Sequence, residues 1–108
     1  MEDLFSLYKY IKTKYNNYRA ITYAEGKITI CFHDELVMEL RLQGYYVIYV
    51  NNYFFYSIDW QDIQETIDDL LTEQYVFCER NKRIFVVKIE DVDDTIYSHI
   101  WSLERTLK

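Results

Sequence analysis

The spacing of apolar side chains along the first segment, about residues 3–15, is that of a helix. Apolar and aromatic residues recur there at intervals of three and four: Leu4, Leu7, Tyr8, Ile11 and Tyr15. Such intervals place side chains on one helical face. We therefore expect an N-terminal helix, with Lys9, Lys12 and Lys14 lying off its buried face.

From about residue 19 to residue 58 the period changes to two. Apolar residues occupy every second position in two runs: Ile28, Ile30 and Phe32, then Leu36, Met38, Leu40 and Leu42. This alternation is typical of half-buried strands. Turn residues separate the runs: Glu25-Gly26, His33-Asp34, Gln43-Gly44 and Asn51-Asn52. The pattern predicts a meander of five antiparallel strands.

The segment 45–56 departs from this alternation because aromatic residues occupy both faces: Tyr45, Tyr46, Tyr49, Tyr53, Phe54, Phe55 and Tyr56. They cannot all point inward if one face of a single sheet meets solvent. Two interpretations stay open. The segment is a central core hairpin whose hydroxyls reach water, or it exposes an aromatic patch that binds a partner, with Tyr49, Tyr53 and Phe55 as the candidate interface.

The next segment predicts an acidic helix that begins at Asp59. Asp59 would cap the free N–H groups of the first turn, and Asp62 would sit at the third helical position, near the positive end of the dipole. Five apolar residues would form the buried side: Trp60, Ile63, Ile67, Leu70 and Leu71. This helix would follow the meander directly.

The last third predicts a second hairpin and a C-terminal helix. Residues 75–78 and 83–89 have the composition of two strands, although the first could instead extend the acidic helix. From Asp91–Asp94 onward, apolar residues recur at helical spacing: Val92, Ile96, Ile100, Leu103 and Leu107. The predicted fold is a single α+β domain, residues 1–108, with the order α-β5-α-β2-α.

Composition narrows the class of partner. The formal net charge is −6 and the isoelectric point is about 4.8, which argues against direct binding to nucleic acid.

No apolar run is long enough to span a membrane, and the first residues are acidic where a signal peptide is basic. We therefore expect a cytoplasmic protein with reduced thiols, without a disulfide between Cys31 and Cys78.

Residues suited to chemistry are few. Cys31 and His33 share a strand face at a spacing of two, which would suit the start of a metal site or a thiol–imidazole pair, but no Cys or His follows at ligand spacing. Whether Cys78 and His99 join them cannot be read from spacing. Two isolated glycines exclude phosphate-binding loops, and Asp91, Asp93 and Asp94 lack the rest of a calcium loop. We expect no catalytic residue, metal or cofactor.

The acidic run is the sharpest functional signal. Residues 59–73 carry six carboxylates and no cation: Asp59, Asp62, Glu65, Asp68, Asp69 and Glu73. Glu90, Asp91, Asp93 and Asp94 would extend this surface if the two predicted helix starts are adjacent. One interpretation is a solvated face that gives solubility. The other is a row of charge that imitates nucleic-acid phosphates and binds a basic protein.

We therefore expect a non-enzymatic module that binds a basic, nucleic-acid-binding protein. The concrete hypothesis is a phage or mobile-element inhibitor that mimics DNA, such as an anti-CRISPR protein, and it rests on size, acidity and absent chemistry. The alternative is a homo-oligomeric structural or adaptor protein, a homodimer in the simplest case. Its interface would be the aromatic residues Tyr49, Tyr53 and Phe55.

Overall fold

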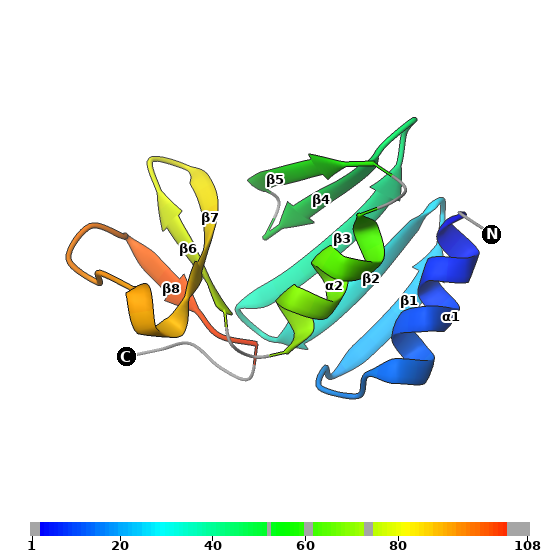
Figure 1. Cartoon of the computed structure of the whole chain (residues 1–108), viewed down its shortest axis with the longest axis horizontal. Helices are drawn as coiled ribbons and strands as arrows, with labels where there is room; N and C mark the ends of the chain where they lie inside the picture. Colours follow the sequence, from blue (N-terminus) through cyan, green and yellow to red (C-terminus); the bar gives the residue numbers. More distant parts are fainter. Residues whose placement is uncertain (1–2, 52, 60–61, 73–74, 104–108) are drawn as a thin grey trace.

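In this computed structural model, five strands form one antiparallel sheet in which they lie in chain order (Figure 1). The structure describes residues 3–51, 53–59, 62–72 and 75–103, with the backbone alone at 55–57. The strands are β1 (Ala20–Ala24), β2 (Lys27–His33), β3 (Leu36–Leu42), β4 (Tyr46–Val50) and β5 (Tyr53–Ile58). Each pairs antiparallel with the next, which confirms the predicted meander.

Residues at positive φ form turns of this sheet. Glu25 and Gly26 join β1 to β2 with φ values of 56° and 75°, as the twist of a two-residue hairpin requires. Asn51, with φ of 51°, follows β4. Its side chain accepts from the Val37 amide and donates to the Glu35 carbonyl, both at 2.8 Å. The turn is thereby fastened to the start of β3.

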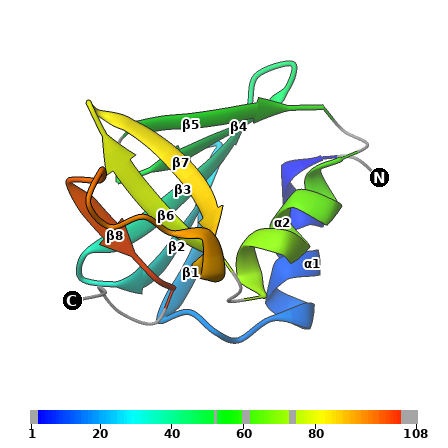
Figure 2. The same ribbon diagram turned by 60° about the vertical axis from the view of Figure 1, so that its left-hand side comes forward.

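Two helices cover one face of the sheet and lie side by side (Figures 1 and 2). They are α1 (Leu4–Lys14) and α2 (Ile63–Leu71). The Asp3 carboxylate caps α1 by accepting from the Ser6 amide at 2.8 Å. The buried residues of the helices include Leu7, Ile11 and Ile67. They pack in one core with alternating residues of the sheet: Ile28, Ile30, Met38, Leu40, Ile48 and Val50.

Helix α2 begins later than predicted. Its first helical residue is Ile63, not Asp59, and Asp62 precedes it without a side-chain capping bond. The reason is that β5 continues to Ile58, which is buried in the core, so Asp59 directly follows a strand and does not begin a helix. The predicted buried side is confirmed for Ile63, Ile67, Leu70 and Leu71, whereas Trp60 lies outside the described residues.

A second, three-stranded sheet has the order β7-β6-β8. It consists of β6 (Tyr75–Arg80), β7 (Arg83–Lys88) and β8 (His99–Trp101). The predicted second hairpin is therefore confirmed, and the alternative in which residues 75–78 extend the acidic helix is wrong. Asn81 and Lys82, both at positive φ, form its turn.

The predicted C-terminal helix is wrong over the described residues. Ile89–Asp91 form only a short 3-10 turn, η1, and β8 follows after an irregular segment. The Asp93 carboxylate accepts from the amide and hydroxyl of Thr95, at 3.1 and 2.6 Å, a local turn that competes with helix formation. Burial of Trp101 and Leu103 has the period of a strand, while Ile96 is exposed. Leu107 lies outside the described residues.

The contact between the helices centres on Asp68 of α2. Its carboxylate accepts from the Tyr10 hydroxyl at 2.9 Å, from the Lys14 ammonium at 3.0 Å and from the Tyr15 hydroxyl. Asn17 also donates to the Leu71 carbonyl at 2.8 Å, which satisfies one of the backbone acceptors at the end of α2. The chain from Tyr10 to Asn17 thus holds α2 through polar bonds as well as packing.

The pKa values of this cluster follow from the same contacts. Burial favours the neutral form of Asp68, but hydrogen bonds from Tyr15, Lys14 and Tyr10 outweigh it and hold the pKa of that carboxyl below its usual value. Burial and the bond to Asp68 raise the pKa of Tyr15 to about 12. Asp68 is therefore a charged acceptor at neutral pH.

We predict that Asp68→Asn lowers the free energy of unfolding by about 1–3 kcal/mol at neutral pH, because three donors lose a charged acceptor. The folded-state pKa is depressed, so the contribution is complete above the unfolded value of about 4 and disappears as pH falls through the folded-state pKa. Urea unfolding across this acidic range measures the difference.

Asp69→Asn is the matched control, since Asp69 is exposed on the same helix and should cost less than about 0.5 kcal/mol. Equal destabilisation by the two variants, or a difference that does not shrink in acid, would contradict the role assigned to Asp68.

Candidate functional site

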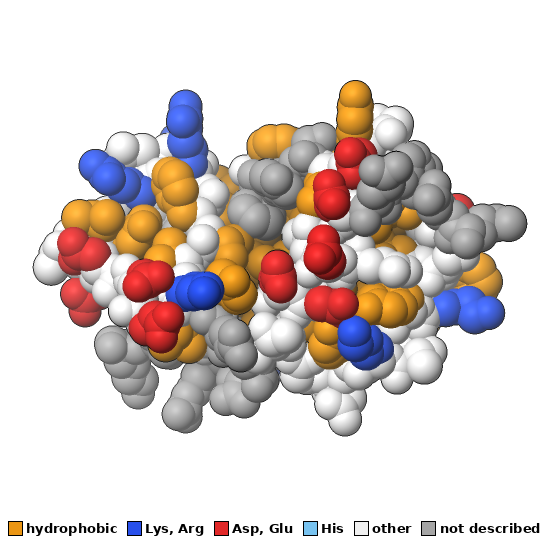
Figure 3. All heavy atoms as spheres, viewed as in Figure 1, with side chains coloured by type: hydrophobic (Ala, Val, Ile, Leu, Met, Phe, Trp, Pro, Cys, Tyr) orange, Lys and Arg blue, Asp and Glu red, His pale blue; other side chains and the backbone are white. Residues whose placement is uncertain are grey.

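Three exposed carboxylates, which we call the acidic ridge, follow one side of α2: Asp62, Glu65 and Asp69. Their intervals of three and four residues correspond to steps of about 4.5 and 6 Å along the helix axis. Figure 3 shows acidic side chains gathered over this helix. None of the three forms an ion pair within the described part of the chain.

The other acids of the run differ from the ridge. Asp68 is committed to the contact with α1, and Asp59 is exposed but has a partner within the protein. Glu73 lies outside the described residues. The structure therefore separates Asp62, Glu65 and Asp69 from neighbours that have the same charge but different surroundings.

A second group of exposed acids lies at and after η1: Glu90, Asp91, Asp93 and Asp94. In Figure 3 this face carries acidic side chains over α2 and, separately, beside the second sheet, with hydrophobic side chains between them. Asp93 is engaged by Thr95, whose hydroxyl and amide lower the pKa of that carboxyl. The two groups therefore form separate patches on this face.

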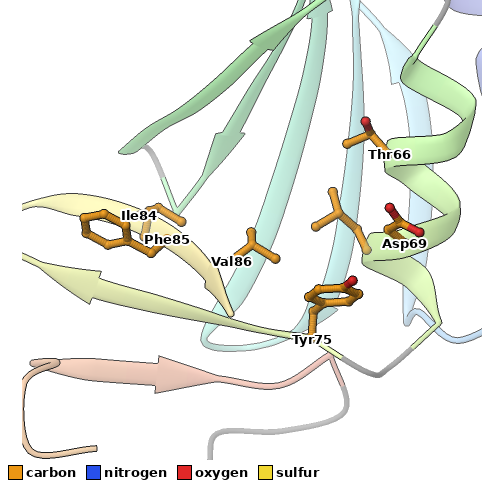
Figure 4. Close-up of a pocket in the computed structure, with 7 residues that line it drawn as sticks. Thr66, Asp69, Tyr75, Ile84, Phe85 and Val86 are labelled. Atoms are coloured by element: carbon orange, nitrogen blue, oxygen red, sulfur yellow. The ribbon is translucent and has the colours of Figure 1, made fainter. Parts of the chain in front are cut away.

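A groove of about 360 Å³ lies between α2 and the second sheet (Figure 4). Its walls are mainly apolar: Thr66, Asp69, Leu70, Tyr75, Ile84, Phe85 and Val86. Leu70 and Ile84 are buried, whereas Phe85 is 42% exposed. Asp69 belongs to the ridge as well as to the groove, so a charged row borders an apolar hollow.

The aromatic segment is divided between core and surface. Tyr46 is fully buried, and Tyr53 is half-buried against the core. Tyr49 and the exposed Phe54 pair edge to face with ring centroids 6.0 Å apart, and the Arg41 guanidinium lies 5.1 Å from the Tyr49 ring centre. The Phe55 side chain lies outside the described residues. Tyr49 and Tyr53 therefore occupy different environments.

Cys31 and His33 lie on β2, whereas Cys78 and His99 lie on two neighbouring strands of the second sheet. Both cysteines are free thiols, and burial raises the pKa of Cys78 to about 11. His33 accepts from the Glu35 amide at Nδ1, so its Nε2 donates to the Ser102 carbonyl at 3.0 Å. Within the described ranges, no group of three His, Cys, Asp or Glu residues is placed to hold a metal ion.

One carboxylate–imidazole pair has no local signal in the sequence. The buried Glu79 accepts from the Lys82 amide at 2.7 Å and from His99 Nδ1 at 3.1 Å, and these two bonds hold the pKa of its carboxyl below the usual value. The exposed His99 ring stacks on Trp101, with centroids 5.4 Å apart. Such a pair can orient an imidazole for base catalysis, but no described hydroxyl or thiol bonds to His99. The register instead places Glu79 opposite His99, so the pair fastens β8 to β6.

Neither family models, curated proteins nor solved structures gave a match to this chain. Among the described helices, none is long and apolar enough to cross a membrane. The acidic ridge and the adjoining groove are therefore the features of the described residues that bear on function.

We predict that the groove tolerates change at its rim but not at its floor. Phe85→Thr should lower the free energy of unfolding by less than about 1 kcal/mol, because much of the ring is already in water. Leu70→Ala should cost about 2–5 kcal/mol, because it opens a cavity in the core. Chemical denaturation measures both changes in the free energy of unfolding. A loss well above about 1 kcal/mol for Phe85→Thr would show that Phe85 contributes to the core.

Proposed function

We propose that the protein is a non-enzymatic binding module whose acidic ridge and groove dock on a basic surface of another protein. The observation that carries this proposal is the position of Asp62, Glu65 and Asp69. All three are exposed and have no ion pair within the described residues, and Asp69 also lines an apolar groove. Complementary charge would speed association and orient the partner.

The magnitudes favour the ridge and groove acting together. An exposed ion pair contributes about 0.2–1 kcal/mol, so three such pairs alone give a weak complex. Burying one Leu- or Phe-sized side chain contributes about 1.5–3 kcal/mol more. The expected partner therefore presents an apolar side chain flanked by Lys or Arg.

The proposed class of partner is a nucleic-acid-handling protein, because such proteins present basic grooves. The net charge of −6 favours attraction to that surface. In its most concrete form, the protein is an inhibitor from a phage or mobile element that occupies the nucleic-acid groove of a CRISPR nuclease. The ridge, about 10 Å long, would take the place of a few successive phosphates.

The test compares two triple variants that change the net charge equally. One neutralises the ridge, with Asp62→Asn, Glu65→Gln and Asp69→Asn, and the other neutralises the second patch, with Glu90→Gln, Asp91→Asn and Asp94→Asn. Competition against labelled DNA for a panel of guide-loaded CRISPR nucleases measures binding. We expect the wild type and the second variant to displace DNA, and the ridge variant to need at least about tenfold more protein.

Two further measurements separate the parts of the site. Phe85→Thr, with an intact fold, should weaken displacement without changing its salt dependence, because it removes apolar contact alone. Raising salt from about 50 to about 200 mM should weaken displacement by the wild type. Equal competition by both triple variants, or no displacement from any nuclease in the panel, would contradict the proposal.

A further inference from the structure

Strand β1 is an open edge of the five-stranded sheet. Among the described strands it pairs with β2 alone, whereas β5, at the other edge, packs beside β7. Four of its five residues are exposed: Ala20, Thr22, Tyr23 and Ala24. An edge strand presents unpaired N–H and C=O groups that can pair with another strand.

The residues of this edge are self-complementary in the antiparallel direction. Residues 19–25 read Arg-Ala-Ile-Thr-Tyr-Ala-Glu. With Thr22 at the centre, Arg19 corresponds to Glu25, Ala20 to Ala24, and Ile21 to Tyr23. A two-fold axis at Thr22 would therefore bring opposite charges together at both ends, apolar residues together between them, and two threonines together in the middle.

The backbone has the parity that this register requires. In a two-residue hairpin the flanking residues, here Ala24 and Lys27, face each other as a hydrogen-bonded pair. Backbone groups alternate in direction along a strand, so Ile21 and Tyr23 direct theirs to the open edge. Ile21 and Tyr23 are also the residues that a two-fold axis at Thr22 places opposite each other.

The side chains at this edge also suit a second copy. Tyr23 lies beside Phe5 and Tyr8 of α1, with ring centroids 5.7 Å from each. Phe5 is 49% and Tyr23 is 41% exposed, so the apolar cluster is incompletely covered. Arg19 bonds Asp34 but its side chain remains 56% exposed. It therefore has donors available for Glu25 of a second copy.

We propose that two copies of this chain form a symmetric dimer in which their β1 strands pair antiparallel about Thr22. The two five-stranded sheets then become one continuous sheet. The interface differs from the aromatic segment at residues 45–56, and it leaves the acidic ridge open, because the ridge lies on α2, whereas the helix that packs beside β1 is α1. Dimerisation through β1 is therefore independent of docking by the ridge.

Sedimentation velocity over a range of concentrations tests the dimer. Glu25→Arg places like charges opposite at both ends of the interface and should raise the dimer dissociation constant at least about tenfold. Glu90→Arg, the same charge change on the exposed η1, should leave it unchanged. Adding Arg19→Glu to Glu25→Arg should restore dimerisation, because the charges are complementary again.

Thiol cross-linking tests the register. In the proposed dimer Thr22 of one copy lies opposite Thr22 of the other in a non-hydrogen-bonded pair. The two Cα atoms of such a pair lie about 4.5 Å apart, which is within the reach of a disulfide. Thr22→Cys should therefore form a covalent dimer with oxidised glutathione, which is reduced as the two thiols join. Thr13→Cys, exposed on α1, should not.

The proposal is overturned if the wild type sediments as a monomer throughout, or if Glu25→Arg leaves the dimer unchanged. It is also overturned if the folded charge-swap double variant stays monomeric, or if Thr22→Cys cross-links no faster than Thr13→Cys. Circular dichroism of each variant shows whether its fold is retained.

Discussion

The apolar face of the five-stranded sheet must be removed from water, and the positions of both helices follow from this requirement. Alternating residues of β2, β3 and β4 place a continuous hydrophobic layer on one face. Two short helices supply the cover. Helices of this length are marginal in isolation, so α1 and α2 exist because their apolar faces are buried against the sheet.

Packing alone does not determine how the two helices are joined, and Asp68 supplies a directional contact. Its partners Tyr10, Lys14 and Tyr15 all come from the C-terminal half of α1 or the residue after it. With one side of α2 held by α1 and another packed on the sheet, its remaining side faces solvent and the groove. Asp68 faces α1, whereas Asp69, the next residue along the helix, is exposed.

Local periodicity was sufficient to predict the elements whose partners follow directly in the chain. The helix at residues 4–14, the meander and the buried side of α2 all follow from spacing. The prediction of a C-terminal helix was wrong because Val92, Ile96 and Ile100 happen to have helical spacing. Pairing of β8 with β6, which is distant in the sequence, determines the structure of this segment. The predicted start of α2 was wrong because Asp59 directly follows β5, and the helix begins only at Ile63.

The candidate site was only partly predictable, for the same reason. Asp68 and Asp69 are neighbours of identical type, and the partners that distinguish them lie more than fifty residues away in the sequence. The groove joins Leu70 to Ile84 and Val86, whose proximity depends on how the second sheet packs. The sequence indicated an acidic surface, but its exposed part follows from tertiary structure.

If the acidic ridge and the groove are the proposed docking face, a bound partner should cover both. Hydrogen–deuterium exchange on the protein, free and bound to a nuclease whose DNA it displaces, tests this claim most directly. We expect slower exchange on binding within residues 62–72 and 83–88, with β1 unchanged. Protection confined to other parts of the chain would contradict it.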